Sequence, residues 1–188
     1  MWLHIAGELV LAAACAAAAL AALRHRAALA ALGFGLIGIT ALIGAFVYGG
    51  VPGAEAPHEA VGFLAARIGL LLVAAKGWPG MKRGLLLVGA CAVALLVPGV
   101  VSLGISVLAL VAIAWPGRSA RWPLALAGAL LFALAGLVIG TRGEWLGVAR
   151  VDLYHLGIAL AVLAWTFAGV GRPLPPRLPA PDAGRRLA

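Results

Sequence analysis

The sequence predicts an all-α polytopic membrane protein, a bundle of seven transmembrane helices. Hydrophobic residues make up 64% of the 188 residues and charged residues only 11%, whereas a soluble domain is about half apolar and a quarter charged. The mean hydropathy of +1.11 points to the bilayer as the solvent of the chain. Apolar runs of the length of a spanning helix, about 20 residues, recur along the chain and supply the helices.

The first three apolar runs are separated by short polar connections. The first has no basic region before it, so we interpret it as a helix and not as a signal peptide. The second contains Gly33, Gly35, Gly38 and Gly44, and small residues of this kind permit close packing between membrane helices. The third contains Arg67. These features predict three spans, the second of them closely packed on its neighbours.

The fourth and fifth runs are short and meet at "VPGV", and the last two are long. Pro98 lacks a backbone donor and Gly99 permits a tight turn, so the short pair either spans a thin region or forms a hairpin that does not fully cross. We expect a bundle over residues 1–171 and a disordered cytoplasmic tail over residues 172–188. The predicted helices cover residues 2–23, 27–49, 59–76, 84–97, 100–115, 122–140 and 150–170.

The distribution of basic residues predicts the orientation. Eleven of the fourteen Lys and Arg residues fall in one set of connections and the tail, whereas the opposite set holds Arg142 and Arg150 alone. Basic residues mark the cytoplasmic side of a membrane protein, so we expect the N-terminus outside and the C-terminus in the cytoplasm. This explains the pI of about 11.1 without nucleic acid as a partner.

Polar residues gather where the predicted helices enter the membrane from outside. Three pairs open these helices: His4 with Glu8, His58 with Glu59, and Asp152 with His155. His4 and Glu8 are four residues apart and Asp152 and His155 three apart, so each pair shares one helical face. Tyr48 ends the second predicted helix on the same side. We therefore expect the first, second, third and seventh predicted helices to surround a polar cavity open to the outside.

Two ionisable residues lie deeper in this predicted cavity. Glu8 is roughly 9 Å below the start of its span and Arg67 roughly 12 Å, and Thr40 falls at comparable depth. An intramembrane arginine requires a partner, and we expect Glu8 to be that partner, with Asp152 second. Simpler interpretations remain open: Asp152 as a helix cap, Glu8 with Arg67 as a structural pair, and Tyr48 as an interfacial residue.

The three outer histidines suggest a metal or a haem. Zinc in a catalytic site takes three protein ligands and a water, so His4, His58 and His155 are candidate ligands, with Asp152 as a general base beside His155. His58 and His155 are alternatively candidate axial ligands of a haem b. A quinone or proton-relay site around Glu8 and Arg67 is a further option without a sequence signature, and the absence of any cofactor is also compatible with the residues.

The layout resembles that of the alkaline ceramidase and adiponectin-receptor superfamily. The resemblance covers most of the chain and rests on seven helices, an acid in the first helix, a polar end to the second and an Asp-x-x-His entrance to the seventh. It implies a zinc amidohydrolase that acts on lipid amides. That family places zinc ligands at the end of the second helix and in a His-x-x-x-His pair in the seventh. Here Tyr48 and Ala159 stand at two of these positions, so the resemblance carries over His155 alone as a ligand, with Asp152 nearby. Uncharacterised bacterial seven-helix membrane families share the same general layout.

These observations lead to one main functional hypothesis and two alternatives. We expect an integral protein of a bacterial inner membrane whose outward-open pocket serves a metal-assisted hydrolase or binds a lipid-like substrate. The first alternative is a non-catalytic membrane subunit of a larger complex, in contact with lipids and other subunits. The second is an electron-transfer protein that binds haem or quinone. The residues are compatible with an enzyme and with a non-catalytic protein.

Overall fold

The computed structural model of the protein, which describes residues 2–75 and 81–172, is helical apart from one short hairpin. α3, η1 and α4 follow one another without a break, and so do α7 and η2, so the described part of the chain contains seven helical rods. They agree with the predicted helices within a few residues. The elements are α1 (Trp2–Arg24), α2 (Ala28–Tyr48), α3 (Glu55–Leu64), the π-helical turn η1 (Ala65–Gly69), α4 (Leu70–Ala74), α5 (Met81–Leu96), α6 (Gly99–Ala114), α7 (Trp122–Leu134), the π-helical turn η2 (Ala135–Ile139), β1 (Glu144–Trp145), β2 (Val148–Ala149) and α8 (Arg150–Ala168).

Five of the rods are long and apolar enough to cross a membrane. They are α1, α2, the continuous helix over Glu55–Ala74, the continuous helix over Trp122–Ile139, and α8. The other two, α5 and α6, have 16 residues each, which is fewer than the roughly 20 that a full crossing requires. Residues 173–188, predicted as a disordered tail, lie outside the described residues.

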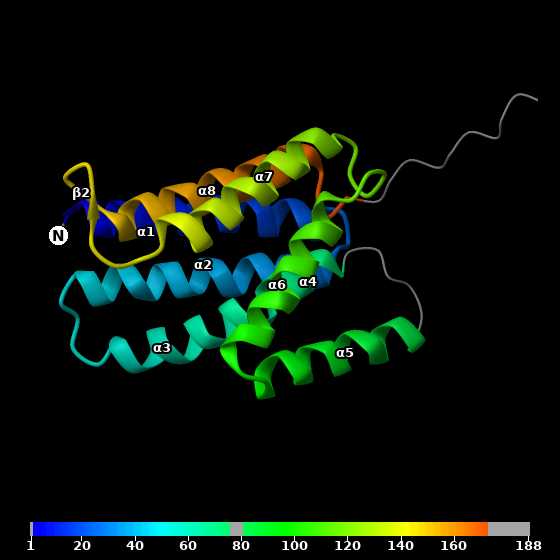
Figure 1. The fold of residues 1–188 in the computed structure, drawn as a ribbon, viewed down its shortest axis with the longest axis horizontal. Coiled ribbons are helices and arrows are strands. Elements are labelled where there is room, and N and C mark those ends of the chain that lie inside the picture. The colour runs from blue at the N-terminus through cyan, green and yellow to red at the C-terminus, as the bar shows by residue number, and fades with distance from the viewer. Residues whose placement is uncertain (1, 76–80, 173–188) are drawn as a thin grey trace, which may run out of the picture.

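Most of the long helices run side by side (Figure 1). α1 packs on α2 and α8, and α8 packs on α7. α1 and α8 begin at the same end of the bundle, because His4 contacts Asp152. In Figure 1, α6 crosses the bundle obliquely, and α5 turns into α6 partway along it and not at its end.

Small residues form the centre of the bundle. The buried side chains of α1 that face α2 and α8 are mostly alanines and Cys15, which is fully buried. Trp165 of α8 is also fully buried, and its indole Nε1 donates a hydrogen bond of 3.1 Å to the carbonyl oxygen of Ala125 in α7. Small side chains let backbones approach closely, and membrane helices associate through such packing.

The glycines of α2 confirm the predicted close helix contacts at three positions. A Cβ atom added at Gly33 would meet the carbonyl oxygen of Gly69, and one added at Gly38 would lie 2.8 Å from the Cβ of Cys15. At Gly44 the added atom would lie 2.7 Å from the Cδ of Glu8. α2 is therefore packed tightly between α1 and the helix over Glu55–Ala74.

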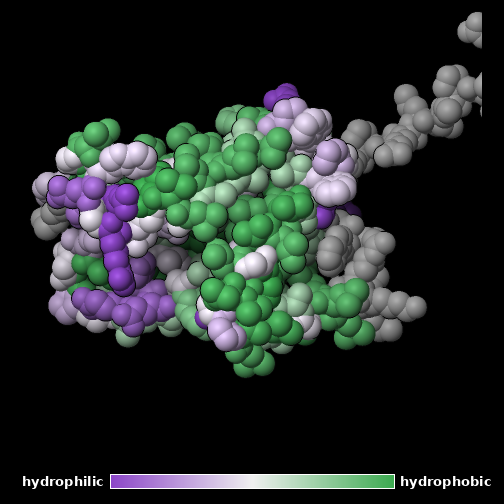
Figure 2. All heavy atoms as spheres, in the orientation of Figure 1, coloured by the Kyte–Doolittle hydropathy of each residue, from purple (hydrophilic) through white to green (hydrophobic). Residues whose placement is uncertain are grey.

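One end of the bundle is markedly polar. Figure 2 shows hydrophilic side chains over the β1–β2 hairpin and the start of α3, and hydrophobic surface over α5 and α6. The hairpin pairs Glu144 with Ala149 and Trp145 with Val148, and both residues of its turn, Leu146 and Gly147, have positive φ. The polar end is the one at which α1 and α8 begin, and the candidate site lies just below it.

Candidate functional site

Two acid–histidine pairs join α1 to α8. Asp152 Oδ1 of α8 lies 2.6 Å from His4 Nδ1 of α1, and Glu8 Oε1 of α1 lies 3.5 Å from His155 Nε2 of α8. In the first pair α8 supplies the acid and α1 the imidazole, and in the second pair α1 supplies the acid and α8 the imidazole. Because positions three or four apart lie one turn apart on the same face, the pairs stack one above the other along the α1–α8 interface.

Burial increases from the outer pair to the inner pair. The side chains of His4 and Asp152 are 27% and 11% exposed, whereas those of His155 and Glu8 are 11% and 2% exposed. An isolated charge at the inner position would be costly. The close approach of Glu8 and His155 lets the two share one proton with no net charge, as a neutral pair or as an ion pair.

His58 of α3 faces the same region from the opposite side. Its Nδ1 lies 3.2 Å from the backbone carbonyl oxygen of Thr40. Since a carbonyl oxygen only accepts, Nδ1 carries the proton and Nε2 is left as an acceptor in the neutral ring. Gly44 is the residue that lets the two sides approach, because a Cβ there would lie 2.7 Å from the Cδ of Glu8 and 3.1 Å from the Cε1 of His58.

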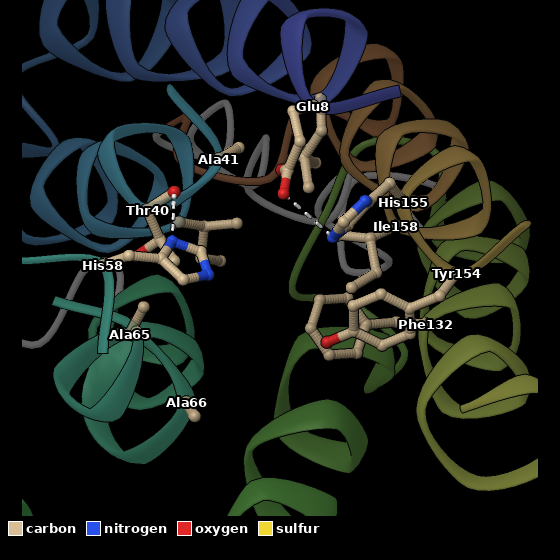
Figure 3. Close-up of a pocket in the computed structure, with 13 residues that line it drawn as sticks. Glu8, Thr40, Ala41, His58, Ala65, Ala66, Phe132, Tyr154, His155 and Ile158 are labelled. Carbon is tan, nitrogen blue, oxygen red and sulfur yellow. Dashed lines mark hydrogen bonds and ion pairs between the residues drawn. The ribbon is translucent and has the colours of Figure 1, made fainter. Parts of the chain in front are cut away.

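A cavity of about 120 Å³ lies between these groups (Figure 3). Its polar lining comes from Glu8, Thr40, His58, Tyr154 and His155, and its apolar lining from Leu11, Ile37, Ala41, Gly62, Ala65, Ala66, Phe132 and Ile158. In Figure 3, His58, Ala65 and Ala66 of the α3–η1 helix stand on one side of the cavity, and Tyr154 and Phe132 stand on the other. Ala66 is an exposed residue, so this edge of the cavity is its open rim.

The four helices predicted to surround a polar cavity do line one, as α1, α2, α3 and α8. Four of the predicted site residues, Glu8, Thr40, His58 and His155, contribute to it directly. Asp152 and Tyr48 lie one layer further out with His4, whose ring centroid is 5.0 Å from that of Tyr48. The sequence pattern therefore located the cavity, while the helix over Trp122–Ile139 adds a wall through Phe132 that the pattern did not predict.

Tyr154 and Phe132 were missed because their signals are weak. Tyr154 precedes His155 in the sequence, and its ring centroid lies 5.3 Å from that of the imidazole. An aromatic residue beside a histidine in an apolar run is most simply a core residue. Phe132 stands in a run without a polar neighbour, so no feature of the sequence distinguished it from other lipid-facing or core residues.

The expected pair of Glu8 with Arg67 is wrong. Arg67 occupies the middle of η1, and its Nη1 donates hydrogen bonds of 2.9 Å to the carbonyl oxygen of Ala94 and 2.6 Å to that of Val97. Its guanidinium also lies over the ring of Phe63, with 4.8 Å to the centroid. The arginine thus caps the C-terminal end of α5, where backbone carbonyls lack helical partners. Glu8 contacts His155 instead.

The three histidines predicted as zinc ligands contact three different partners. His4 contacts Asp152, His58 contacts the carbonyl oxygen of Thr40, and His155 contacts Glu8. Across residues 2–75 and 81–172, no three His, Cys, Asp or Glu side chains are grouped closely enough to hold a metal ion. Each histidine therefore lies against a different oxygen acceptor.

Comparisons with family models, with curated proteins and with solved structures give no match to the chain.

Proposed function

We propose that this chain is an integral membrane protein that binds a small amphipathic, lipid-like ligand in the cavity between α1, α2, α3, α7 and α8. The observation that carries the proposal is the division of the cavity wall. Glu8, His58 and His155 provide hydrogen-bonding groups, while Leu11, Ile37 and Ile158 belong to its apolar lining. Ligand pockets typically combine apolar walls with a few placed polar groups.

The proposal includes an orientation and a topology. In the sequence, eleven of the fourteen basic residues fall in one set of connections and the tail, which supports an N-terminus outside and a bacterial inner membrane as the location. Five long helices support five full crossings. The short helices α5 and α6 then enter and leave on the cytoplasmic side, so the parity of the seven-helix prediction is preserved.

The size and charge of the cavity restrict the ligand. An apolar cavity of about 150 Å³ holds one benzene-sized molecule, so about 120 Å³ accommodates a short segment of a ligand and the rest extends past the rim at Ala66. A Glu8–His155 pair without net charge suits a neutral group that both donates and accepts hydrogen bonds. An alcohol or an amide at the end of an acyl chain has this chemistry.

The experiment is purification in mild detergent followed by mass spectrometry of the organic extract. We expect the wild-type protein and Leu64→Trp to retain the same amphipathic compound, and Ala66→Trp to lose it. Both substitutions place an indole on an exposed position of the helix over Glu55–Ala74, but only Ala66 lines the cavity. Equal retention by both variants would contradict the proposal.

The same sample tests the polar wall and the cofactors that the histidines suggest. Glu8→Gln keeps the shape of the side chain and removes its acid function, and Glu59→Gln makes the same change at an exposed position. We expect only the first to reduce ligand retention. Elemental analysis and a visible spectrum measure zinc and haem. If retention of the ligand depends on zinc or on haem, the site is a metal or haem site and does not bind the ligand through protein groups alone.

A further inference from the structure

A second, larger cavity lies between α4, α5 and α6, outside the site described above. Its volume is about 470 Å³, and all its lining residues are apolar. Leu71 and Ala74 contribute from α4, Ala90 and Val93 from α5, and Ile105 and Ala109 from α6. None of them lines the Glu8–His155 cavity. We call this cavity the hairpin groove.

The hairpin groove exists because α5 and α6 diverge from a shared turn. The two helices contact each other at few positions, while α6 packs on α4 and α7. At the deep end, Arg67 fixes the turn by donating to the carbonyl oxygens of Ala94 and Val97. Arg67 lies near the middle of the helix over Glu55–Ala74, so the turn closes the groove at about mid-depth of the bundle.

A basic residue, Arg118, lies at the other end of the hairpin groove. The Arg118 Nη2 donates a hydrogen bond to the carbonyl oxygen of Ala74, a residue of the groove wall. In the sequence, Lys76 directly follows the groove residue Ala75, and Lys82 and Arg83 fall in the first turn of α5. No acidic residue occurs between Glu59 and Glu144 in the sequence.

We propose that the hairpin groove binds one acyl chain of an anionic phospholipid, with the phosphate of the headgroup at Arg118. An apolar groove in a membrane helix bundle that is closed at depth and basic at its mouth matches a lipid that has both a chain and a negative headgroup. Basic pockets between membrane helices recognise anionic headgroups in this way. The volume is about three times that of a cavity for one benzene-sized molecule, which suits a chain and not a whole lipid. This site is independent of the function proposed for the outer cavity.

The test is native mass spectrometry of the purified chain after exchange into phosphatidylglycerol or phosphatidylcholine with identical acyl chains. We expect one phosphatidylglycerol to be retained preferentially. Ala90→Phe fills the groove and should abolish that retention, whereas Ala92→Phe, the same change at an exposed position of α5 that does not line the groove, should preserve it. Equal retention of the two lipids, or retention unaffected by Ala90→Phe, would overturn the proposal.

The headgroup contact has its own control. Arg118→Gln should lower the preference for phosphatidylglycerol roughly fivefold, since one basic residue contributes about 1 kcal/mol to the attraction of an anionic lipid. Arg121→Gln makes the same change of charge three residues later, at an exposed position, and should leave the preference unchanged. Inorganic phosphate added in excess should not displace the lipid. Displacement by phosphate would mean a simple anion site and contradict the role of the acyl chain.

Discussion

At the scale of single residues, the spacing of Asp152 and His155 at the start of α8 matches that of their partners on α1. Asp152 and His155 are three positions apart, and the partners His4 and Glu8 are four positions apart. The outer pair joins His4 to Asp152 at 2.6 Å, and the inner pair joins Glu8 to His155 at 3.5 Å. Each acid therefore has an imidazole on the other helix. A function as a cap is not needed to explain Asp152, and no side-chain cap is present at the start of α8.

A double-mutant cycle on His4→Ala and Asp152→Asn tests the outer pair. We expect each single change to lower the stability of the protein in detergent, and the double change to cost less than their sum. A hydrogen bond to a charged group contributes about 1.5–3 kcal/mol, and partial exposure of His4 reduces this, so a coupling energy of about 1 kcal/mol is expected. Thermal or denaturant unfolding measures it, and additive effects would show that the 2.6 Å contact does not stabilise the fold.

The residue scale also shows where sequence reasoning was sufficient and where it failed. Helical spacing alone placed His4 with Glu8 and Asp152 with His155 on shared helical faces at the same side of the membrane, because the period of an α-helix is fixed. It could not assign partners. Arg67 donates hydrogen bonds to backbone carbonyls at the end of α5. Every residue has a backbone carbonyl, so the types of the residues in the sequence do not indicate such a partner.

At the scale of elements, Gly44 of α2 is the point at which α1 and α3 approach each other. We expect Gly44→Ala to lower stability by about 1–3 kcal/mol, the usual cost of overpacking, because the new Cβ would lie 2.7 Å from the Cδ of Glu8. It should also reduce ligand retention by shifting Glu8 and His58. Gly35→Ala in the same helix is the matched control, since nothing lies within 4 Å of its added Cβ, and unfolding curves of the two variants separate a local clash from loss of helix flexibility.

The bounds of the elements were predictable because the length of an apolar run sets the length of a membrane helix. The depth reached by α5 and α6 was not predictable. The "VPGV" turn is compatible with a turn at the far surface or within the bilayer, and only the contact of Arg67 with Ala94 and Val97 relates the turn to the middle of another helix.

The position of this turn yields a prediction for chemical labelling. In a Cys91→Ala background, a cysteine at Leu96 should not react with a membrane-impermeant maleimide from either side, because a side chain at mid-depth faces hydrocarbon. Leu146→Cys should react readily. Both leucines are highly exposed on the protein, at 86% and 93%, so the comparison isolates membrane depth. Reaction of Leu96→Cys from the same side as Leu146→Cys would mean that α5 and α6 cross the bilayer completely.

At the scale of the whole molecule, polarity and positive charge are segregated to opposite ends. The polar end carries the acid–histidine pairs and the β1–β2 hairpin. The other end, where α1 ends and α7 begins, carries Arg24, Arg26, Arg118 and Arg121. The outer cavity and the hairpin groove lie toward these different ends. In a membrane the protein would thus present its two sites to different leaflets.

This asymmetry predicts the orientation in the cell membrane. Basic residues are retained on the cytoplasmic side, so the connections and tail that hold eleven of the fourteen basic residues should face the cytoplasm. In the Cys91→Ala background, Leu146→Cys should react with the impermeant maleimide in intact spheroplasts. Arg121→Cys, an exposed residue at the start of α7, should react only in inverted vesicles. The reverse pattern would turn the Glu8–His155 cavity toward the cytoplasm, and the ligand would then have to come from the inner leaflet. Labelling of both residues from one side would instead require an even number of crossings between Arg121 and Leu146, whereas the continuous helix over Trp122–Ile139 supplies one.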